Sequence, residues 1–536
     1  MAATATTVVL TLGLVVGCGS GNDTAAAAAL GEFAVAIEQQ DVQAAAELTT
    51  SPAPAAETLG ATFAGMAAEK VDVEVDDPVE YSDGTASFSM KTTWKWSDDE
   101  TFETTTSGTA RELSAGWKVQ WSPGLVYPDM AVGARLQKIR TDARPAPTVN
   151  SRSGKPFMKM EPVNEIVFDP AAAGRRRDAS IAALAAAIKP IAPLITAKSI
   201  TEKVDAADGG PVVAVVLRDP DMEVLASDPE KIRGVTVNRT GKLVMVDRRL
   251  SSPLEAGLTN YWTAVRDATA GWQVQLVTPG SRPRRLAGQQ GPPAEDIATA
   301  IDQNQQLVLG DAVVEVAQPA TMMTLDASTG GILGMAQNGA AADHGVHAGT
   351  EYPTGSTLDA VFEAAGKKPG DVGDLLYHFG LGARFTAPGV SLPATPGKPR
   401  ISVADFAPAD HAASMLNMGA LGVALARASR GQHDAVAPFL VKGVPTKVEP
   451  APLGDLDGQT ADAILAAMKR VAKTGDASDL TGAPGLQALV GTNGPQGPGW
   501  FLGIQGGRVL VIYCEGEKSG TAALQVAQKY FRVLNS

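Results

Sequence analysis

Ser356 is the residue of this sequence that is best placed to act as a nucleophile. The stretch Thr324–Val361 predicts a strand, a tight turn, a second short strand, a Gly/Ala-rich loop and then a helix that opens on Ser356. Such a strand–loop–helix junction presents a hydroxyl to substrate, as serine acylases do. The hydroxyl needs a base to take its proton, and Asp359 follows one helical turn later on the same face.

The segments around this junction resemble the penicillin-binding transpeptidases, in which a strand pair of the form LDPKTGEILAMA leads through a loop into YPPGSTFK. The matching residues are Leu325, Asp326, Ser328, Thr329, Gly330, Ile332, Leu333, Met335, Ala336, Tyr352, Pro353, Gly355, Ser356 and Thr357. The resemblance implies that Ser356 holds the nucleophile position and that Asp359 replaces the family's catalytic lysine. An aspartate can accept a proton, but it adds negative charge where the substrate carboxylate and the oxyanion would lie. Lys367 and Lys368 are too distant to substitute unless the loop folds back.

The second motif of the family, SxN, has no counterpart at its expected position. The literal match, Ser20-Gly21-Asn22, lies in a polar tether near the N-terminus. In the family, a further helical segment and a GQG sequence follow SxN, and Ala412–Ala428 resembles the segment after GQG. The chain between Asp359 and Ala412 is therefore too short, and the SxN-bearing part is interpreted as deleted.

The third motif, KTG, matches at two places that do not suit its role. Lys473-Thr474-Gly475 ends a predicted helix, where glycine is a common terminator, and Lys518-Ser519-Gly520 follows the last predicted strand. By its distance to Trp500, the equivalent position is Gly491–Gly494. Thr492 and Asn493 would line the substrate strand there, without the lysine.

Composition excludes several other classes of function. The chain has 536 residues and a formal net charge of −13, with no long basic cluster, so no nucleic-acid partner is expected. Two cysteines cannot form a disulfide framework, and Cys514 is predicted to be buried in a strand. His344 and His347 have no third ligand spaced with them, so neither a metal nor a cofactor is expected.

The N-terminus indicates export and lipidation. Val8–Gly17 is an apolar run of the length of a signal-peptide core, and it ends at Cys18 in a pattern that resembles a bacterial lipobox. Residues 1–18 are therefore interpreted as a lipoprotein signal peptide and residues 19–26 as a tether. No Lys or Arg precedes Lys70, which leaves two alternatives: a start codon upstream, or a cytoplasmic chain with a fortuitous apolar start.

The rest of the chain predicts a multidomain α+β protein. Helical periodicity over Ala27–Leu48, with a break near Asp41, precedes strict alternation over Thr85–Trp96. Residues 27–130 resemble the NTF2-like cone of some class B penicillin-binding proteins. Residues 131–290 then fit an extended linker or pedestal domain, and residues 291–536 fit the serine β-lactamase-like transpeptidase α/β domain with its central antiparallel sheet.

These observations favour an extracytoplasmic, lipid-anchored, catalytically degenerate relative of the class B penicillin-binding proteins. Its expected role is binding or scaffolding at the bacterial cell wall, with peptidoglycan, its stem peptides, or cell-wall synthesis or division proteins as partners. Two alternatives stay open. Ser356 could still act in a D,D-transpeptidase or carboxypeptidase with a non-standard base, or the NTF2-like domain could capture a ligand.

Overall fold

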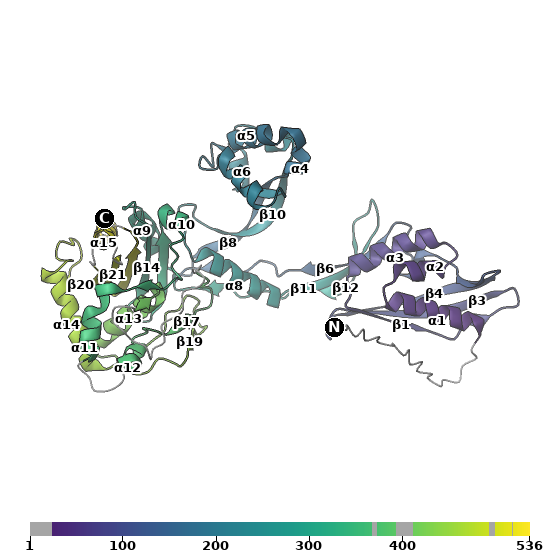
Figure 1. The fold of residues 1–536 in the computed structure, drawn as a ribbon. Coiled ribbons are helices and arrows are strands. Elements are labelled where there is room, and N and C mark those ends of the chain that lie inside the picture. Colours follow the sequence, from purple (N-terminus) through teal and green to yellow (C-terminus); the bar gives the residue numbers. More distant parts are fainter. Residues whose placement is uncertain (1–23, 367–371, 393–410, 492–498, 517, 536) are drawn as a thin grey trace, which may run out of the picture. The chain divides into compact units, whose positions relative to one another are not determined.

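The computed structural model describes residues 24–366, 372–392, 411–491, 499–516 and 518–535. Its contacts divide the chain into two compact units (Figure 1). The first consists of residues 1–144 and 269–292, and the second of residues 145–268 and 293–536. The expected middle domain, residues 131–290, contributes to both units, and its boundaries stay a prediction.

Three helices precede a five-stranded antiparallel sheet in the first unit. The helices are α1 (Ala25–Glu38), α2 (Val42–Glu47) and α3 (Pro52–Met66). Asp41 caps α2 by accepting hydrogen bonds from the backbone N–H groups of Gln43 and Ala44, which confirms the predicted helix break. The strands run in the order β1 (Lys70–Val75), β3 (Thr85–Lys95), β4 (Thr101–Leu113), β5 (Gly116–Val119), and β2 (Val79–Glu80) pairs with β3.

The alternation predicted for Thr85–Trp96 is present in β3. Its even-numbered residues are buried and its odd-numbered residues are half-buried, as expected when one face of a sheet covers a core. Phe88 and Trp94 extend into that core, where they meet Phe33 and Phe63 from the helices. The helices therefore cover one face of the sheet and leave the other to solvent.

A second sheet completes the core of the first unit. It is antiparallel, with the strand order β12 (Arg284–Gln289), β11 (Gly271–Val277), β6 (Arg135–Thr141). Leu136 and Val274 are fully buried in the same core as the helices α1–α3. The rings of Trp96 and Trp272 lie 5.8 Å apart, and the Lys138 ammonium lies 4.6 Å from the Trp96 ring centre. Segments more than a hundred residues apart thus share one core.

The second unit begins with a sheet built on the long strand β8 (Pro156–Phe168). It pairs along its length with β10 (Val235–Met245), and on its other side with β7 (Val149–Asn150) and β9 (Val212–Arg218). A parallel pairing joins β7 to β13 (Ile297–Ala298). The helical elements that follow β8, β9 and β10 are α4 (Pro170–Ala173), α5 (Arg177–Ile188), α6 (Ala197–Ala206), α7 (Asp219–Met222) and α8 (Glu255–Ala268).

The centre of the second unit is a five-stranded antiparallel sheet between two layers of helices. Its strand order is β15 (Ile332–Gln337), β14 (Ala320–Asp326), β22 (Arg508–Cys514), β21 (Gly499–Gln505), β20 (Gln487–Val490). Helix α13 (Met415–Ala428), buried along its whole length, packs on one face. Helices α9 (Gln303–Val313) and α15 (Ser519–Leu534) pack on the other. Cys514 is completely buried in β22, which confirms its predicted place in the core.

The remaining elements of the second unit surround this sheet. They are α10 (Gly339–Asp343), β16 (Tyr352–Pro353), η4 (Gly355–Leu358), α11 (Asp359–Gly366), α12 (Val372–His378), β17 (Arg384–Thr386), β18 (Ala412–Ala413), β19 (Lys447–Glu449) and α14 (Gly458–Thr474). Among the described residues, none of the helices is long and apolar enough to cross a membrane. The protein is thus a mixed α/β structure with several antiparallel sheets.

Candidate functional site

Ser356 lies next to the edge of the five-stranded sheet. It belongs to the short 3-10 helix η4, which follows β16 directly and contacts the edge strand β20. The Ser356 side chain is half-buried. The turn therefore places Ser356 between a short strand and a helix, beside β20, which is the strand-to-helix junction that the sequence predicted.

Asp359 follows Ser356 at the junction of two helices. Its backbone N–H donates a hydrogen bond to the carbonyl oxygen of Ser356, and the α-helix α11 begins at this residue. Its side chain is exposed. In the described part of the chain, no hydrogen bond joins the Ser356 hydroxyl to the Asp359 carboxylate. The carboxylate therefore stands one turn after the serine without acting on its proton in this structure.

Hydrogen bonds and aromatic rings hold the turn that precedes Ser356. The backbone N–H of Thr354 donates to the carbonyl oxygen of His411 at 2.9 Å, and its hydroxyl donates to the same oxygen at 3.1 Å. The indole N–H of Trp500 donates to the carbonyl oxygen of Pro353 at 3.0 Å. The rings of Tyr352 and Tyr513 stack with their centres 4.1 Å apart. Contacts from three distant segments thus position this turn.

His411 is a titratable residue near this turn that the sequence analysis did not single out. Its ring packs edge-on against Phe362 of α11, with 5.7 Å between the ring centres, and its Nδ1 lies 3.4 Å from the Thr354 hydroxyl. Burial lowers the pKa of His411 to about 4, so the imidazole is neutral at pH 7. The sequence around a single histidine does not indicate that it packs beside this turn, because the residues that it contacts lie far along the chain.

The remaining predicted site residues fall into two groups. Cys18, Thr492, Asn493, Lys367 and Lys368 lie outside the described residues. The two KTG matches are described, and neither lies on a strand. Lys473 and Thr474 end α14, and Lys518 is the N-cap of α15 with a positive φ of 55°. The first sequence therefore ends a helix and the second begins one, and neither lines a substrate strand.

The two histidines of the loop before Ser356 make separate contacts. His344 is exposed, and its Nδ1 lies 2.8 Å from the carbonyl oxygen of Ala340. The backbone N–H of His347 donates to the hydroxyl of Tyr352 at 2.9 Å. Within the described ranges, no group of three or more histidine, cysteine or acidic residues could hold a metal ion.

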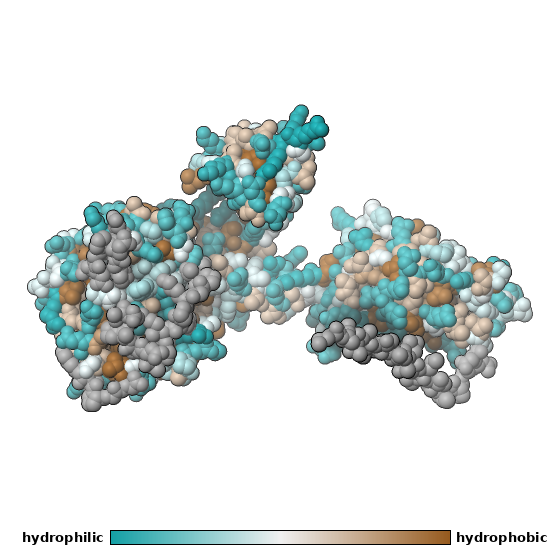
Figure 2. Space-filling view, in the orientation of Figure 1, coloured by the Kyte–Doolittle hydropathy of each residue, from teal (hydrophilic) through white to brown (hydrophobic). Residues whose placement is uncertain are grey.

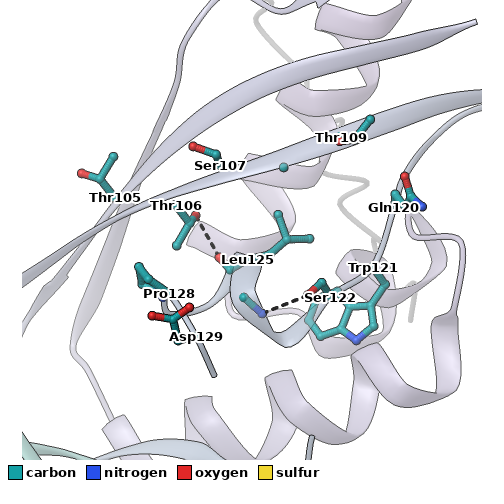
Figure 3. A pocket seen from close by; sticks show the side chains of 12 residues that line it. Thr105, Thr106, Ser107, Thr109, Gln120, Trp121, Ser122, Leu125, Pro128 and Asp129 are labelled. Atoms are coloured by element: carbon teal, nitrogen blue, oxygen red, sulfur yellow. Dashed lines mark hydrogen bonds between the residues drawn. The ribbon is translucent and has the colours of Figure 1, made fainter. Parts of the chain in front are cut away.

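A separate groove, of about 570 Å³, lies on the first unit. Figure 3 shows it between β4, which contributes Thr105, Ser107 and Thr109, and the loop that carries Gln120, Trp121 and Asp129. Its lining is rich in hydroxyl groups and contains one charged side chain, that of Asp129. On the face of the first unit visible in Figure 2, apolar residues are scattered among polar ones.

Comparison with known protein families finds one domain within the first unit. Residues 25–134 match the family described as the NTF2-like N-terminal transpeptidase domain. This match confirms the predicted NTF2-like domain, and the similarity to the penicillin-binding type of transpeptidase applies to these residues. No curated protein matches the chain.

Proposed function

We propose that this protein is a lipid-anchored, extracytoplasmic relative of the class B penicillin-binding proteins whose transpeptidase-like domain does not acylate. Its proposed role is to bind or scaffold at the bacterial cell wall. Peptidoglycan, its stem peptides, or proteins of cell-wall synthesis or division are the proposed partners. The match of residues 25–134 to an N-terminal transpeptidase domain supports the cell-wall role.

The single observation that carries the loss of catalysis is the position of Asp359. A serine acylase of this kind needs a base close to its hydroxyl, and here the residue one turn later is an exposed carboxylate that makes no hydrogen bond to Ser356 in the described structure. Aspartate is negatively charged at neutral pH. It would therefore repel the substrate carboxylate and the oxyanion of an acyl transfer.

Labelling with a fluorescent penicillin tests this proposal. We expect the wild-type protein to form no covalent adduct under conditions in which an active class B penicillin-binding protein is labelled to completion. We expect Asp359→Lys to form none either, because the SxN segment and the KTG lysine are still missing. Correct folding of each protein would be checked by its thermal unfolding transition.

The active alternative predicts the opposite result. An adduct on the wild-type protein that disappears in Ser356→Ala would show that Ser356 still acylates and would sink the non-catalytic proposal. An adduct that appears only in Asp359→Lys would show that the lysine alone had been lost, and would contradict the proposed loss of the other two motifs.

A further inference from the structure

Strand β4 has an open edge along the groove of the first unit. It pairs with β3 from Thr101 to Arg111, but β5 pairs with it only from Ala110 onward. The backbone N–H of Gln120 donates to the carbonyl oxygen of Thr109 at 2.8 Å, so the backbone groups of Thr109 point to this side. Because backbone groups alternate along a strand, those of Thr105 and Ser107 point the same way. No described strand pairs with them.

Two other edges of this sheet carry hydrogen bonds from neighbouring segments. Residues 48–50 lie along β5, where Thr50 N–H donates to the carbonyl oxygen of Val119 at 2.8 Å and Val119 N–H donates to that of Leu48 at 2.9 Å. At β1, the Glu38 carboxylate accepts from the backbone N–H of Val73 at 3.0 Å. Unpaired strand edges attract other chains, and proteins usually cover them. In the described part of the chain, the backbone groups of Thr105 and Ser107 that face the groove have no such hydrogen bond.

The groove beside this edge is held open by the loop opposite. The Thr106 hydroxyl donates to the carbonyl oxygen of Leu125 at 3.1 Å, and the Ser122 hydroxyl accepts from the backbone N–H of Gly124 at 3.3 Å. A Cβ on Gly108 would lie 2.4 Å from Leu125 Cδ2, so only glycine permits this close approach. The loop is thus fixed against β4 at the groove, and the groove is already formed before a ligand binds.

The dimensions and lining of the groove define what it can hold. From Thr105 to Thr109 the edge spans about 14 Å, at about 3.4 Å per residue, which is the length of a strand of four to five residues. The wall offers hydroxyl and amide groups and the indole of Trp121, and Asp129 supplies its only charge. Without a basic group among the lining residues, the groove is unsuited to a phosphate or a carboxylate.

We propose that this edge binds an extended segment of a partner protein by strand addition, with a lysine or arginine of that segment near Asp129. Thr105 and Ser107 would supply the backbone hydrogen bonds, and Trp121 and the hydroxyl side chains would contact the side chains of the segment. Such an interaction does not depend on acylation at Ser356. The peptide experiment and the penicillin experiment can therefore fail independently.

The test uses the full chain and a fluorescent five-residue peptide of alternating threonine and valine that ends in lysine, with both termini blocked. Two twins of this peptide carry N-methyl groups on alternate amides. In the first twin the methylated amides lie along one edge of the extended peptide, and in the second twin they lie along the opposite edge. We expect saturable binding of the parent in fluorescence anisotropy, and a loss of about tenfold or more for only one twin, since several backbone hydrogen bonds are removed together. Amide exchange should show protection of Thr105 and Ser107 upon binding.

Protein variants separate the backbone edge from its side chains. Ser107→Pro removes the N–H that faces the groove and leaves the pairing with β3 intact, as proline does on an edge strand. We expect it to weaken peptide binding about fivefold, the effect of one hydrogen bond, and the matched control Ser107→Ala to bind as the wild type does. Asp129→Asn should weaken binding about threefold at low salt, and only for peptides that carry the lysine.

Several results would overturn the proposal. They are absence of saturable binding by the parent peptide, equal loss for both methylated twins, or unchanged binding in a folded Ser107→Pro. If Ser107→Pro fails to fold, the amide-exchange result for the wild type decides. Saturable binding of chitotetraose without any binding of the peptide would instead identify the groove as a saccharide site.

Discussion

At the scale of the residue, the negative charge of Asp359 determines what chemistry the turn around Ser356 can support. A lysine one turn after Ser356 could accept its proton and would also attract an anionic substrate. The carboxylate of Asp359 is exposed and offers only the first of these, in a place where negative charge opposes binding. The turn itself persists because hydrogen bonds from Thr354 and Trp500 hold it, and those bonds do not depend on residue 359.

His411 makes this turn sensitive to acid. Its pKa in the folded protein is about 4, below the ordinary value of 6.5, so the unfolded chain binds its proton more tightly. The stability contributed by the neutral imidazole is therefore present above pH 6.5 and is lost as the pH falls toward 4. When the pH falls from 7.5 to 5, we expect protonation of this residue in the unfolded chain to lower the free energy of unfolding by about 2 kcal/mol.

Urea unfolding at the two pH values measures this effect. His411→Gln removes the titrating ring but keeps the backbone carbonyl that accepts from Thr354. The variant should lose about 2 kcal/mol less than the wild type over this interval, since all other groups titrate in both proteins. Equal losses in the two proteins would show that His411 is solvated or partnered in its charged form.

At the scale of the element, helix α13 shows how closely a helix can approach a sheet. A Cβ on Gly419 would lie 2.9 Å from Leu325 Cδ1, and one on Gly422 would lie 2.4 Å from Val509 Cγ1. Both glycines therefore face the sheet and permit direct contact between the helix backbone and side chains of β14 and β22. All fourteen residues of the helix are buried, so it cannot move outward without opening the core.

A pair of glycine substitutions tests this packing. Gly422→Ala should lower the free energy of unfolding by about 1–3 kcal/mol, because the new methyl group overlaps Val509. Gly310→Ala in α9 is the matched control, since nothing lies within 4 Å of its Cβ position. The control should raise stability by about 0.5–1 kcal/mol through the better helix propensity of alanine. If both substitutions shift the chemical denaturation midpoint alike, the close contact at Gly422 does not determine how α13 packs on the sheet.

At the scale of the whole molecule, the proposed cell-wall role requires the chain to be exported and held at the membrane. Cys18 is the residue on which this depends. We expect the wild-type protein expressed in a bacterium to partition into the detergent phase, and Cys18→Ser to partition into the aqueous phase with its leader uncleaved. Metabolic labelling with a palmitate analogue checks the modification directly. An aqueous wild-type protein without label would favour the alternative of a cytoplasmic chain.

The order of elements in the chain does not reveal how the first unit is assembled. Residues 269–292 leave the neighbourhood of α8 and return to pair with β6, and Val274 and Leu276 become part of the core formed by α1–α3. Periodicity describes only local structure, so the sequence predicts a single middle domain over residues 131–290. When a strand pairs with another strand more than a hundred residues away, the residues close to it in sequence do not indicate that partner.

What the sequence determined by itself is local. The alternation in β3, the helix break at Asp41, the burial of Cys514 and the turn that carries Ser356 all follow from side-chain period and turn chemistry within a few residues. Only the tertiary structure decided which strands share a core, which imidazole lies against Thr354, and where β4 stays unpaired. Each of these depends on contacts between distant segments, and burial and hydrogen bonding set them once the whole chain has folded.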